Sequence, residues 1–203
     1  MTHHRNPLFC PNLRLSLHHS FAVDWLHTLS LGVFQDYGGE LVNTLIRLEV
    51  FPAAGSSDEV RRRAAVASIQ ADLFAFYSSE MKLGRVHTQV QRLDPSMFGT
   101  DSQPALKLHG AETNGFLHFC PVLLNKYRGF LTSPDIWLKC CTCLLHMYDL
   151  CHNDVMLTAD HQAFCNDVIM YTRLCDRLGF GKKPKLHFGQ HLAQRSLVRM
   201  EPQ

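Results

Sequence analysis

The chain has 203 residues, of which 46% are hydrophobic and 19% charged, and its 20 basic and 18 acidic side chains leave a formal net charge of +2. A chain of this length buries roughly 70% of its unfolded surface, which is enough for a core without disulfide staples. These values exclude a disordered tail, a collagen-like repeat and a disulfide-dependent miniprotein. They fit one domain, or two small ones, at about 150 residues per domain.

The basic residues are less evenly distributed than the net charge suggests. The even balance predicts no strong steering of the whole chain toward nucleic acid. Residues 177–200 nevertheless contain no acid. This stretch is either a solvated face or a nucleic-acid contact, and the basic side chains that would bind phosphate are Lys182, Lys183, Lys185, Arg195 and Arg199.

The eight cysteines come without a secretory leader pattern. We therefore expect reduced thiols in an intracellular compartment. No apolar run approaches the ~20 residues needed to span a bilayer, so no membrane partner is expected.

Along the chain, residues 1–21 read as an irregular arm, residues 22–195 as a single helical domain and residues 196–203 as a tail. From residue 22 to about residue 50, apolar residues recur at spacings of three and four and predict a helix. Gly32, Gly38 and Gly39 lie inside this span, and each lowers helix stability by about 1 kcal/mol relative to alanine.

A second helix is predicted from the break at residues 52–57 to about Leu83. Ser56 and Glu59 have the spacing of a capping box at its start. Arg61, Arg62 and Arg63 make its first turn basic, either as a contact site or as a solvated surface. The apolar face assigned to this helix consists of Val60, Ala64, Ala67, Ala71, Phe74 and Tyr77.

The remaining pattern is also helical. A short helix is predicted at residues 93–98, and a long segment at residues 111–127 contains Pro121, which should kink or split it. Ser133 and Pro134 are suited to begin a helix that reaches about residue 151. Another helix follows from Thr158 and ends at Gly179, and a last one is expected after residue 184. Because clean period-two strands are missing, we predict an all-α, irregular bundle of about six helices.

Two groups of metal-ligating residue types need an interpretation. Cys140, Cys143 and His146 resemble zinc ligands by type, but they fall on one helical pattern, whereas structural zinc takes separated pairs. Buried thiols on an apolar helix face are the favoured interpretation. His187 and His191 are four residues apart and could share a metal, although packing or capping is the default for such histidines.

Asp24 and His27 form a third candidate group. They are three residues apart at the start of the first predicted helix, so they share a face and could hydrogen-bond or hold one divalent ion. The alternative is an N-terminal capping Asp beside a satisfied histidine.

Three segments, in this order, resemble blocks of transposase-like proteins related to the CACTA (En/Spm) group. Residues 21–33 read FAVDWLHTLSLGV and match a D-x-x-H block followed by L-G-V. Residues 106–113 read LKLHGAET, similar to an L-K block that ends in an acid. Residues 183–191 read KPKLHFGQH, similar to a K-P-K-x-H-x-x-x-H block near the C-terminus of such cores.

This resemblance implies the insertion and C-terminal part of an RNase H-like core that lacks its sheet. The group's enzymes cut and join DNA with two divalent ions, Mg or Mn, held by three acids. The resemblance places catalytic acids at Asp24 and Glu112 and gives His27 a supporting role. Two acids cannot assemble a three-acid site, so we predict no strand transfer and no cofactor for this chain alone, and we assign no metal ligands.

Two functions follow from these patterns. The first is a catalytically incomplete, transposase-derived protein that binds DNA, with a nuclear location. The alternative is a non-enzymatic α-helical interaction module that binds a protein partner or a second copy of itself.

Overall fold

The structure is a computed structural model of the chain, and it describes residues 26–51, 57–153 and 157–180. In these residues it contains five α-helices, one π-helix and two short 3-10 helices, and no strand. The all-α prediction is confirmed for this part of the chain, with five α-helices where about six were expected. The helix expected after residue 184, the arm and the tail lie outside the described residues.

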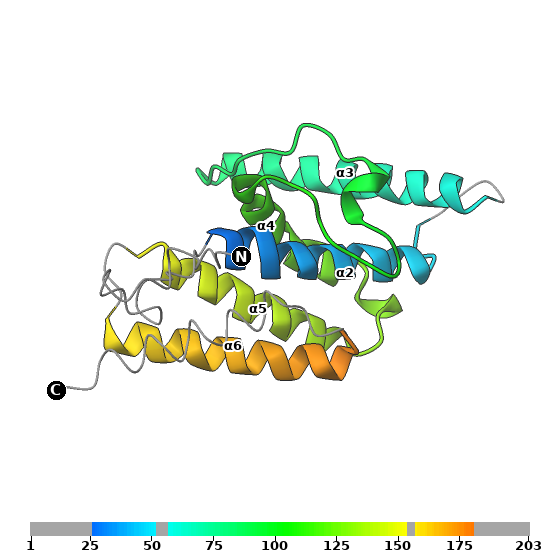
Figure 1. Cartoon of the computed structure of the whole chain (residues 1–203). Coiled ribbons are helices and arrows are strands. Elements are labelled where there is room, and N and C mark those ends of the chain that lie inside the picture. The colour runs from blue at the N-terminus through cyan, green and yellow to red at the C-terminus, as the bar shows by residue number, and fades with distance from the viewer. Residues whose placement is uncertain (1–25, 52–56, 154–156, 181–203) are drawn as a thin grey trace, which may run out of the picture.

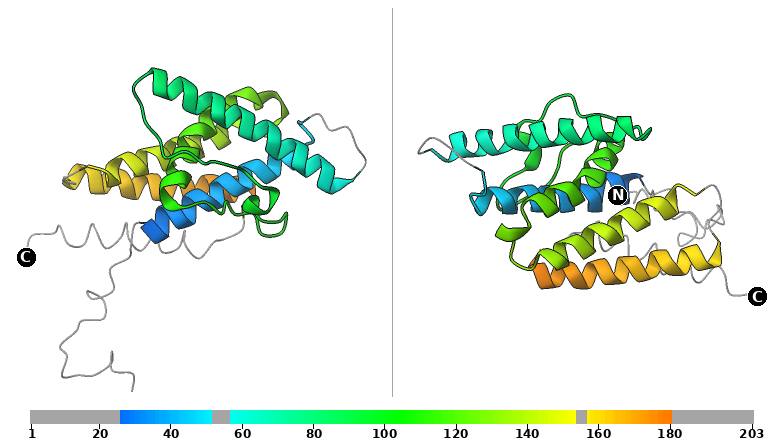
Figure 2. Two further views of the ribbon diagram at one scale, coloured as in Figure 1. Left: turned by 90° about the horizontal axis from the view of Figure 1, so that it is seen from above. Right: turned by 180° about the vertical axis from the view of Figure 1, so that it is seen from behind.

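The helices form three groups that are stacked across the molecule. They are α2 (Phe34–Arg47), α3 (Asp58–Lys82), α4 (Gly110–Lys126), α5 (Pro134–Cys151) and α6 (Thr158–Leu178). Figure 1 shows α3 along one side and the antiparallel α5–α6 pair along the other, with α2 and α4 between them. The views in Figure 2 show the same order and show that α4 crosses α2.

The helix boundaries follow local signals closely. The π-helix Leu26–Val33 leads directly into α2, so the first predicted helix is one continuous element with a wider opening section. Ser57 is the N-cap of α3, and its hydroxyl accepts a hydrogen bond from the backbone N–H of Val60 at 3.3 Å. Gly179 ends α6 in the left-handed conformation with φ of 74°, where a side chain would be strained.

Pro121, which was predicted to kink or split this helix, does not split α4. Because proline has no N–H, the carbonyl of Leu117 loses its usual partner one turn earlier. The thiol of Cys141 on α5 points at this carbonyl, with 4.0 Å between sulfur and oxygen. A neighbouring helix therefore partly replaces the missing hydrogen bond, and α4 runs unbroken from Gly110 to Lys126.

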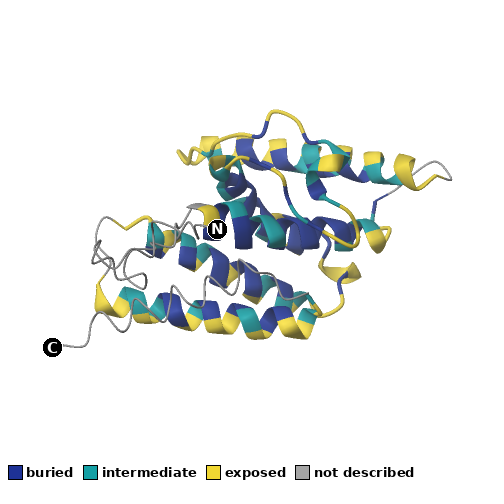
Figure 3. Ribbon diagram, in the orientation of Figure 1, coloured by how far each residue is buried: buried dark blue, intermediate teal, exposed yellow. Residues whose placement is uncertain are grey.

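The core lies where α2, α4, α5 and α6 meet, and the ribbon in Figure 3 is coloured as buried along the sides of these helices that face one another. Tyr37 is completely buried, and its hydroxyl donates to the carbonyl of Trp137 at 2.9 Å. Its ring packs against the rings of Trp137 and Tyr171, with centroids 5.8 and 6.4 Å away. One aromatic side chain of α2 thus joins α5 and α6.

Helix α3 buries a different face from the one predicted. Of the six residues assigned to its apolar face, only Tyr77 is buried. The residues that pack inward are Ala65, Val66, Ile69, Leu73, Phe76 and Tyr77. The prediction was wrong because α3 carries small or apolar residues on two opposite faces, and spacing alone does not say which one packs.

Candidate functional site

Glu112, the acid expected at the second sequence block, lies in the first turn of α4. One of its carboxylate oxygens accepts a hydrogen bond from the backbone N–H of His109 at 3.0 Å. This is the reciprocal half of a capping box, in which an acid satisfies an N–H at the start of a helix. The carboxylate therefore has a structural role that requires no metal.

The other predicted site residues divide between described and undescribed segments. His27 is exposed in the π-helix Leu26–Val33. Outside the described residues lie Asp24, the histidines His187 and His191, and the five basic residues of the C-terminal stretch.

Gln35, in the first turn of α2 and two residues past the first sequence block, connects this part of the chain to the second block. The backbone N–H of Leu106 donates to the carbonyl of Gln35 at 2.9 Å. In return the Gln35 amide donates to the carbonyl of Leu108 at 2.6 Å, and a longer contact of 3.4 Å reaches the hydroxyl of Thr113. We call this region, residues 34–39 with 105–113, the junction.

The two adjacent glycines of α2 make the junction possible in steric terms. A Cβ atom at Gly39 would come within 2.5 Å of the backbone nitrogen of Ala105, and one at Gly38 within 3.1 Å of the Leu106 side chain. Real Cβ atoms do not approach backbone atoms this closely, so the two segments can touch only where α2 has no side chain. The glycines that weaken the predicted helix are thus explained by this contact.

A shallow cavity of about 500 Å³ opens at the junction. Its charged and polar lining comes from Gln35, Gln91, Arg92, Lys107, His109 and Glu112. The lining holds one carboxylate beside two basic side chains, which suits a single anionic group better than a pair of divalent ions. Among the described residues, no cluster of three or more His, Cys, Asp or Glu side chains is placed to hold a metal ion.

The basic first turn of α3 is occupied by internal contacts. Arg61 pairs with Asp58 and Arg63 with Glu59, both exposed and within the helix. Arg62 reaches inward instead, and its guanidinium donates to Asn43 Oδ1 at 2.7 Å and to the carbonyl of Gly99 at 2.8 Å.

Asn43 extends this connection into α2. It is fully buried, and its amide donates to the carbonyls of Gly39 and Phe98 at 2.8 and 2.6 Å. Arg62 and Asn43 therefore tie α3, α2 and the turn before the junction into one unit. The basic turn was predicted to be either a contact site or a solvated surface, and Arg62 is neither, because it has a structural role.

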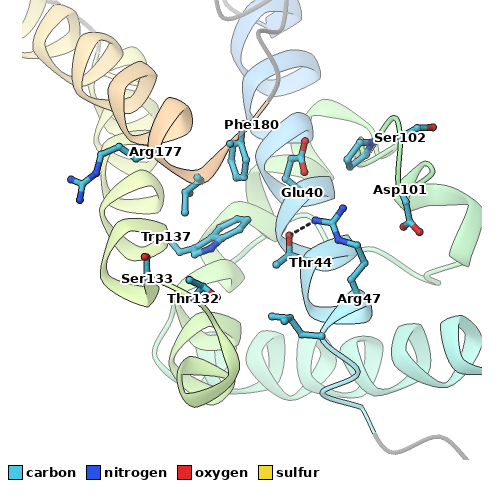
Figure 4. A pocket seen from close by; sticks show the side chains of 14 residues that line it. Glu40, Thr44, Arg47, Asp101, Ser102, Thr132, Ser133, Trp137, Arg177 and Phe180 are labelled. Atoms are coloured by element: carbon cyan, nitrogen blue, oxygen red, sulfur yellow. Dashed lines mark hydrogen bonds between the residues drawn. The ribbon is translucent and has the colours of Figure 1, made fainter.

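A second cavity of about 450 Å³ lies between the C-terminal half of α2, the start of α5 and the end of α6. Figure 4 shows Trp137 and Phe180 on one side of it and Glu40, Arg47 and Asp101 on the other. The two aromatic rings meet edge to face at 5.0 Å. With both signs of charge around an aromatic wall, this cavity has no single chemical preference.

The cysteine group behaves as buried thiols. Cys140 and Cys143 are buried, and burial raises the pKa of the Cys143 thiol to about 11. The pKa of Cys140 is also raised, first by its hydrogen bond with Cys175 and then by burial. These thiols are therefore protonated at neutral pH in the metal-free protein. His146, the third proposed zinc ligand, is exposed and pairs with Asp167 at 2.6 Å.

Comparison with known proteins adds no relative. No protein-family model, characterised protein or solved structure matches the chain. Among the described residues, no helix combines the length and apolar character that crossing a membrane requires.

The sequence analysis missed Gln35, Asn43 and Arg62, which hold the junction and its surroundings together. Of these three residues, only Gln35 has a feature in the sequence that could have indicated its role. The pair Gly38-Gly39 in a predicted helix marks a close backbone approach, and Gln35 precedes it by one turn. Nothing in the sequence distinguishes Arg62 from the two exposed arginines beside it.

Proposed function

We propose that the chain is a transposase-derived protein that does not cut or join DNA by itself and acts by binding DNA. One observation supports this proposal most directly. Gln35, two residues past the first of the sequence blocks that resemble the transposase group, hydrogen-bonds to Leu108 of the second block, 73 residues away along the chain. This contact supports the proposal, since the two segments that carry the resemblance then lie close together.

The loss of catalysis follows from the acids at the junction. A two-metal site needs several carboxylates to hold both ions. Among the described residues that line the cavity at the junction, Glu112 is the one acid, and its carboxylate accepts the backbone hydrogen bond from His109. Binding then remains as the function, with phosphate contacts from the C-terminal basic residues and from Arg92 and Lys107 at the junction.

Fluorescence anisotropy of the full chain with labelled duplex DNA over a range of salt concentrations tests the proposal. Because each neutralised phosphate releases counterions, affinity should fall steeply with salt, with a slope near −0.9 per contact. The double variant Lys183→Glu with Lys185→Glu should bind more weakly and reduce that slope by about 2.

The matched control is Lys139→Glu with Arg173→Glu. It changes the net charge by the same amount at exposed positions of α5 and α6. If both double variants lose affinity equally, the chain is attracted to DNA only by its overall charge, and the assigned lysines do not form the contact. If the unchanged chain does not bind at low salt, the proposal fails.

Catalysis is tested separately with Glu112→Gln. Glutamine can occupy the capping position, so the helix start is kept while the negative charge is removed. We expect no strand cleavage with Mg or Mn by the unchanged chain. Cleavage that Glu112→Gln abolishes would assign this acid to metal binding and contradict the proposed incompleteness.

The alternative, a non-enzymatic helical interaction module, is favoured by a different observation. Exposed Phe74 and Met81 lie on the outer side of α3, opposite the face that packs on the rest of the described residues. That observation is independent of the junction and of any DNA contact.

A further inference from the structure

The outer face of α3 carries a regular pattern of small and apolar side chains. Their spacings alternate between four and three residues, which is the heptad pattern of helices that pair along a seam. All but Ala64, which is half-buried, are exposed. We call these seven residues the α3 stripe: Val60, Ala64, Ala67, Ala71, Phe74, Ser78 and Met81.

The α3 stripe lies opposite the face that packs on the rest of the molecule. The inward face includes Ile69 and Leu73, which are fully buried. Phe74 and Met81 on the stripe are 39% and 60% exposed. Figure 3 shows exposed residues along the outer side of α3, which forms one edge of the molecule. Within the described residues, no other element packs on this side.

Charge is nearly absent from the middle of the helix. Residues 64–79 include a single charged side chain, Asp72, and its carboxylate pairs with Lys126 of α4 at 2.6 Å. The exposed face of a surface helix is normally polar and charged, whereas a helix that is apolar on all sides is normally buried. The composition of α3 therefore indicates that its second face is covered by a partner.

We infer that the partner is a second copy of the chain, whose α3 packs antiparallel on this stripe around a two-fold axis. In an antiparallel pair, positions of the two heptad types face each other. Ala71 then lies opposite Phe74, Ala67 opposite Ser78, and Ala64 opposite Met81. The layers of Ala71 with Phe74 and of Ala64 with Met81 combine a small residue with a larger one, and the layer between them pairs two small residues, so the stripe is complementary to itself in two of the three layers.

The same stripe pairs poorly in parallel. Parallel helices in register place each residue against its own copy, so Phe74 meets Phe74 while Ala67 and Ala71 leave gaps. Ser78 causes no penalty at an antiparallel seam, because its hydroxyl already donates to the carbonyl of Phe74 at 2.9 Å. The flanking arginines at the start of α3 are likewise neutralised within the helix by Asp58 and Glu59.

The size of the stripe sets the expected strength of pairing. From Val60 to Met81 the seam is roughly 30 Å long on a helix about 10 Å wide, which gives on the order of 600 Å² of contact for two copies. Stable complexes bury at least about 1,200 Å², so this dimer belongs with the weak, reversible ones. We expect a dissociation constant on the order of 100 µM, which means much weaker binding than in a permanent dimer.

Sedimentation velocity of the full chain over a concentration series tests the inference. The sedimentation coefficient should rise reversibly with concentration, and at about 0.5 mM more than half of the chains should be paired if Kd is about 100 µM. Ala71→Glu places a charge in the central layer and should weaken pairing at least tenfold. Ala67→Glu should have the same effect at a second layer.

Ala159→Glu is the matched control, because it makes the same change at an exposed position of α6. Its pairing should equal that of the unchanged chain. Far-UV circular dichroism checks that all variants are folded, as expected for exposed helical positions where glutamate is well tolerated. A chain that stays monomeric up to about 0.5 mM, or that dimerises equally with Ala71→Glu, overturns the inference.

Disulfide trapping tests the orientation. Ala67→Cys and Ser78→Cys are prepared as separate variants and oxidised alone or as an equimolar mixture, with the unchanged chain as the background control. Antiparallel pairing predicts a mixed 67–78 disulfide in the mixture and little cross-linking of either variant alone. Cross-linking of Ser78→Cys with itself would instead indicate a parallel pair and overturn the proposed arrangement. DNA plays no part in either experiment, so the two proposals fail independently.

Discussion

Small residues occur on the surfaces of both α2 and α3, and the two regions differ in what covers them. On α2, the backbone of residue 105 lies where a Cβ of Gly39 would be. On α3, Ala67 and Ala71 face outward and are exposed. Both helices carry small residues that allow close approach, and within the described residues the chain supplies an approaching segment at α2 but none at the outer face of α3. Small residues on a helix therefore indicate a close contact, whereas only the three-dimensional structure identifies the segment that makes it.

The largest effect is expected when a side chain is added at the close contact on α2. Gly39→Ala adds a methyl group within 2.5 Å of the backbone of Ala105, and backbone atoms cannot move aside as a flexible side chain can. We expect a loss of about 3 kcal/mol or more in the free energy of unfolding, even though alanine favours helices. Urea unfolding followed by circular dichroism measures the loss.

Gly129→Ala is the control for this change, because nothing lies within 4 Å of a Cβ at that position. We expect it to alter the unfolding free energy by less than about 0.5 kcal/mol. Equal midpoints for Gly39→Ala and the unchanged chain would contradict the close approach and with it the geometry of the junction.

The second prediction concerns how α3 is attached from its inner side. Arg62→Ala removes three hydrogen bonds, two short ones to Asn43 and Gly99 and a long one of 3.5 Å to exposed Asp101, and leaves the buried Asn43 Oδ1 without this donor. We expect a loss of about 2 kcal/mol, since hydrogen bonds to charged groups contribute about 1.5–3 kcal/mol. Thermal and urea unfolding both report this change.

Arg63→Ala provides the matched comparison one residue away. Its pair with Glu59 is exposed and lies within one helical turn, so its loss should lower the unfolding free energy by about 0.3–0.5 kcal/mol. If the two variants behave alike, Arg62 is not the structural arginine that its contacts indicate.

Most of the helical architecture could be predicted from the sequence, because helix ends depend on neighbouring residues. The stop at Gly179 was correct for this reason, since Gly179 adopts the left-handed conformation that ends α6. The start at Pro134 was also correct, although Ser133 makes no side-chain capping hydrogen bond. The inward face of α3 was wrong, because its spacing fits two faces equally well. The continuity of α4 past Pro121 was missed as well, since it involves a thiol from another helix.

The candidate site was harder to predict than the fold for the same physical reason. An acid in a short motif looks the same whether it binds metal or caps a helix. The hydrogen bond between Glu112 and the N–H of His109 separates these roles, and that bond exists only once α4 has formed. The contact of Gln35 with Leu108 spans 73 residues and has no local signature.

A third prediction sharpens the structural role at the junction. Glu112→Ala removes the acceptor for the His109 N–H and should lower the unfolding free energy by about 1 kcal/mol. Glu112→Gln keeps an acceptor and should remain within about 0.5 kcal/mol of the unchanged chain. The two variants are compared by urea unfolding. Equal losses would show that charge, and not the capping hydrogen bond, is what matters at this position.

The smallest predicted effect concerns the His118 ring, which contacts the ring of His87 in the loop after α3. The His118 ring on α4 lies 5.0 Å from that of His87 in the loop and 5.1 Å from that of Tyr148 on α5. Burial first, and then the neighbouring His87, lower the pKa of His118 below its ordinary value of 6.5. Asp149 and Glu80 act in the opposite direction, and Arg85 adds to the lowering.

A lowered histidine pKa makes stability depend on pH in one direction. The unfolded chain takes up a proton below about pH 6.5 more readily than the folded chain does, so stability is complete above that value and falls as the pH drops. Since the ring is partly exposed, the effect should stay well under the about 1.4 kcal/mol of a one-unit shift. His118→Phe keeps the ring contacts and should lose less stability than the unchanged chain between pH 7 and pH 5, as measured by urea unfolding at each pH. Exposed His152→Gln is the control, and an unchanged pH dependence in His118→Phe would show that protonation at α4 does not weaken the attachment of α3.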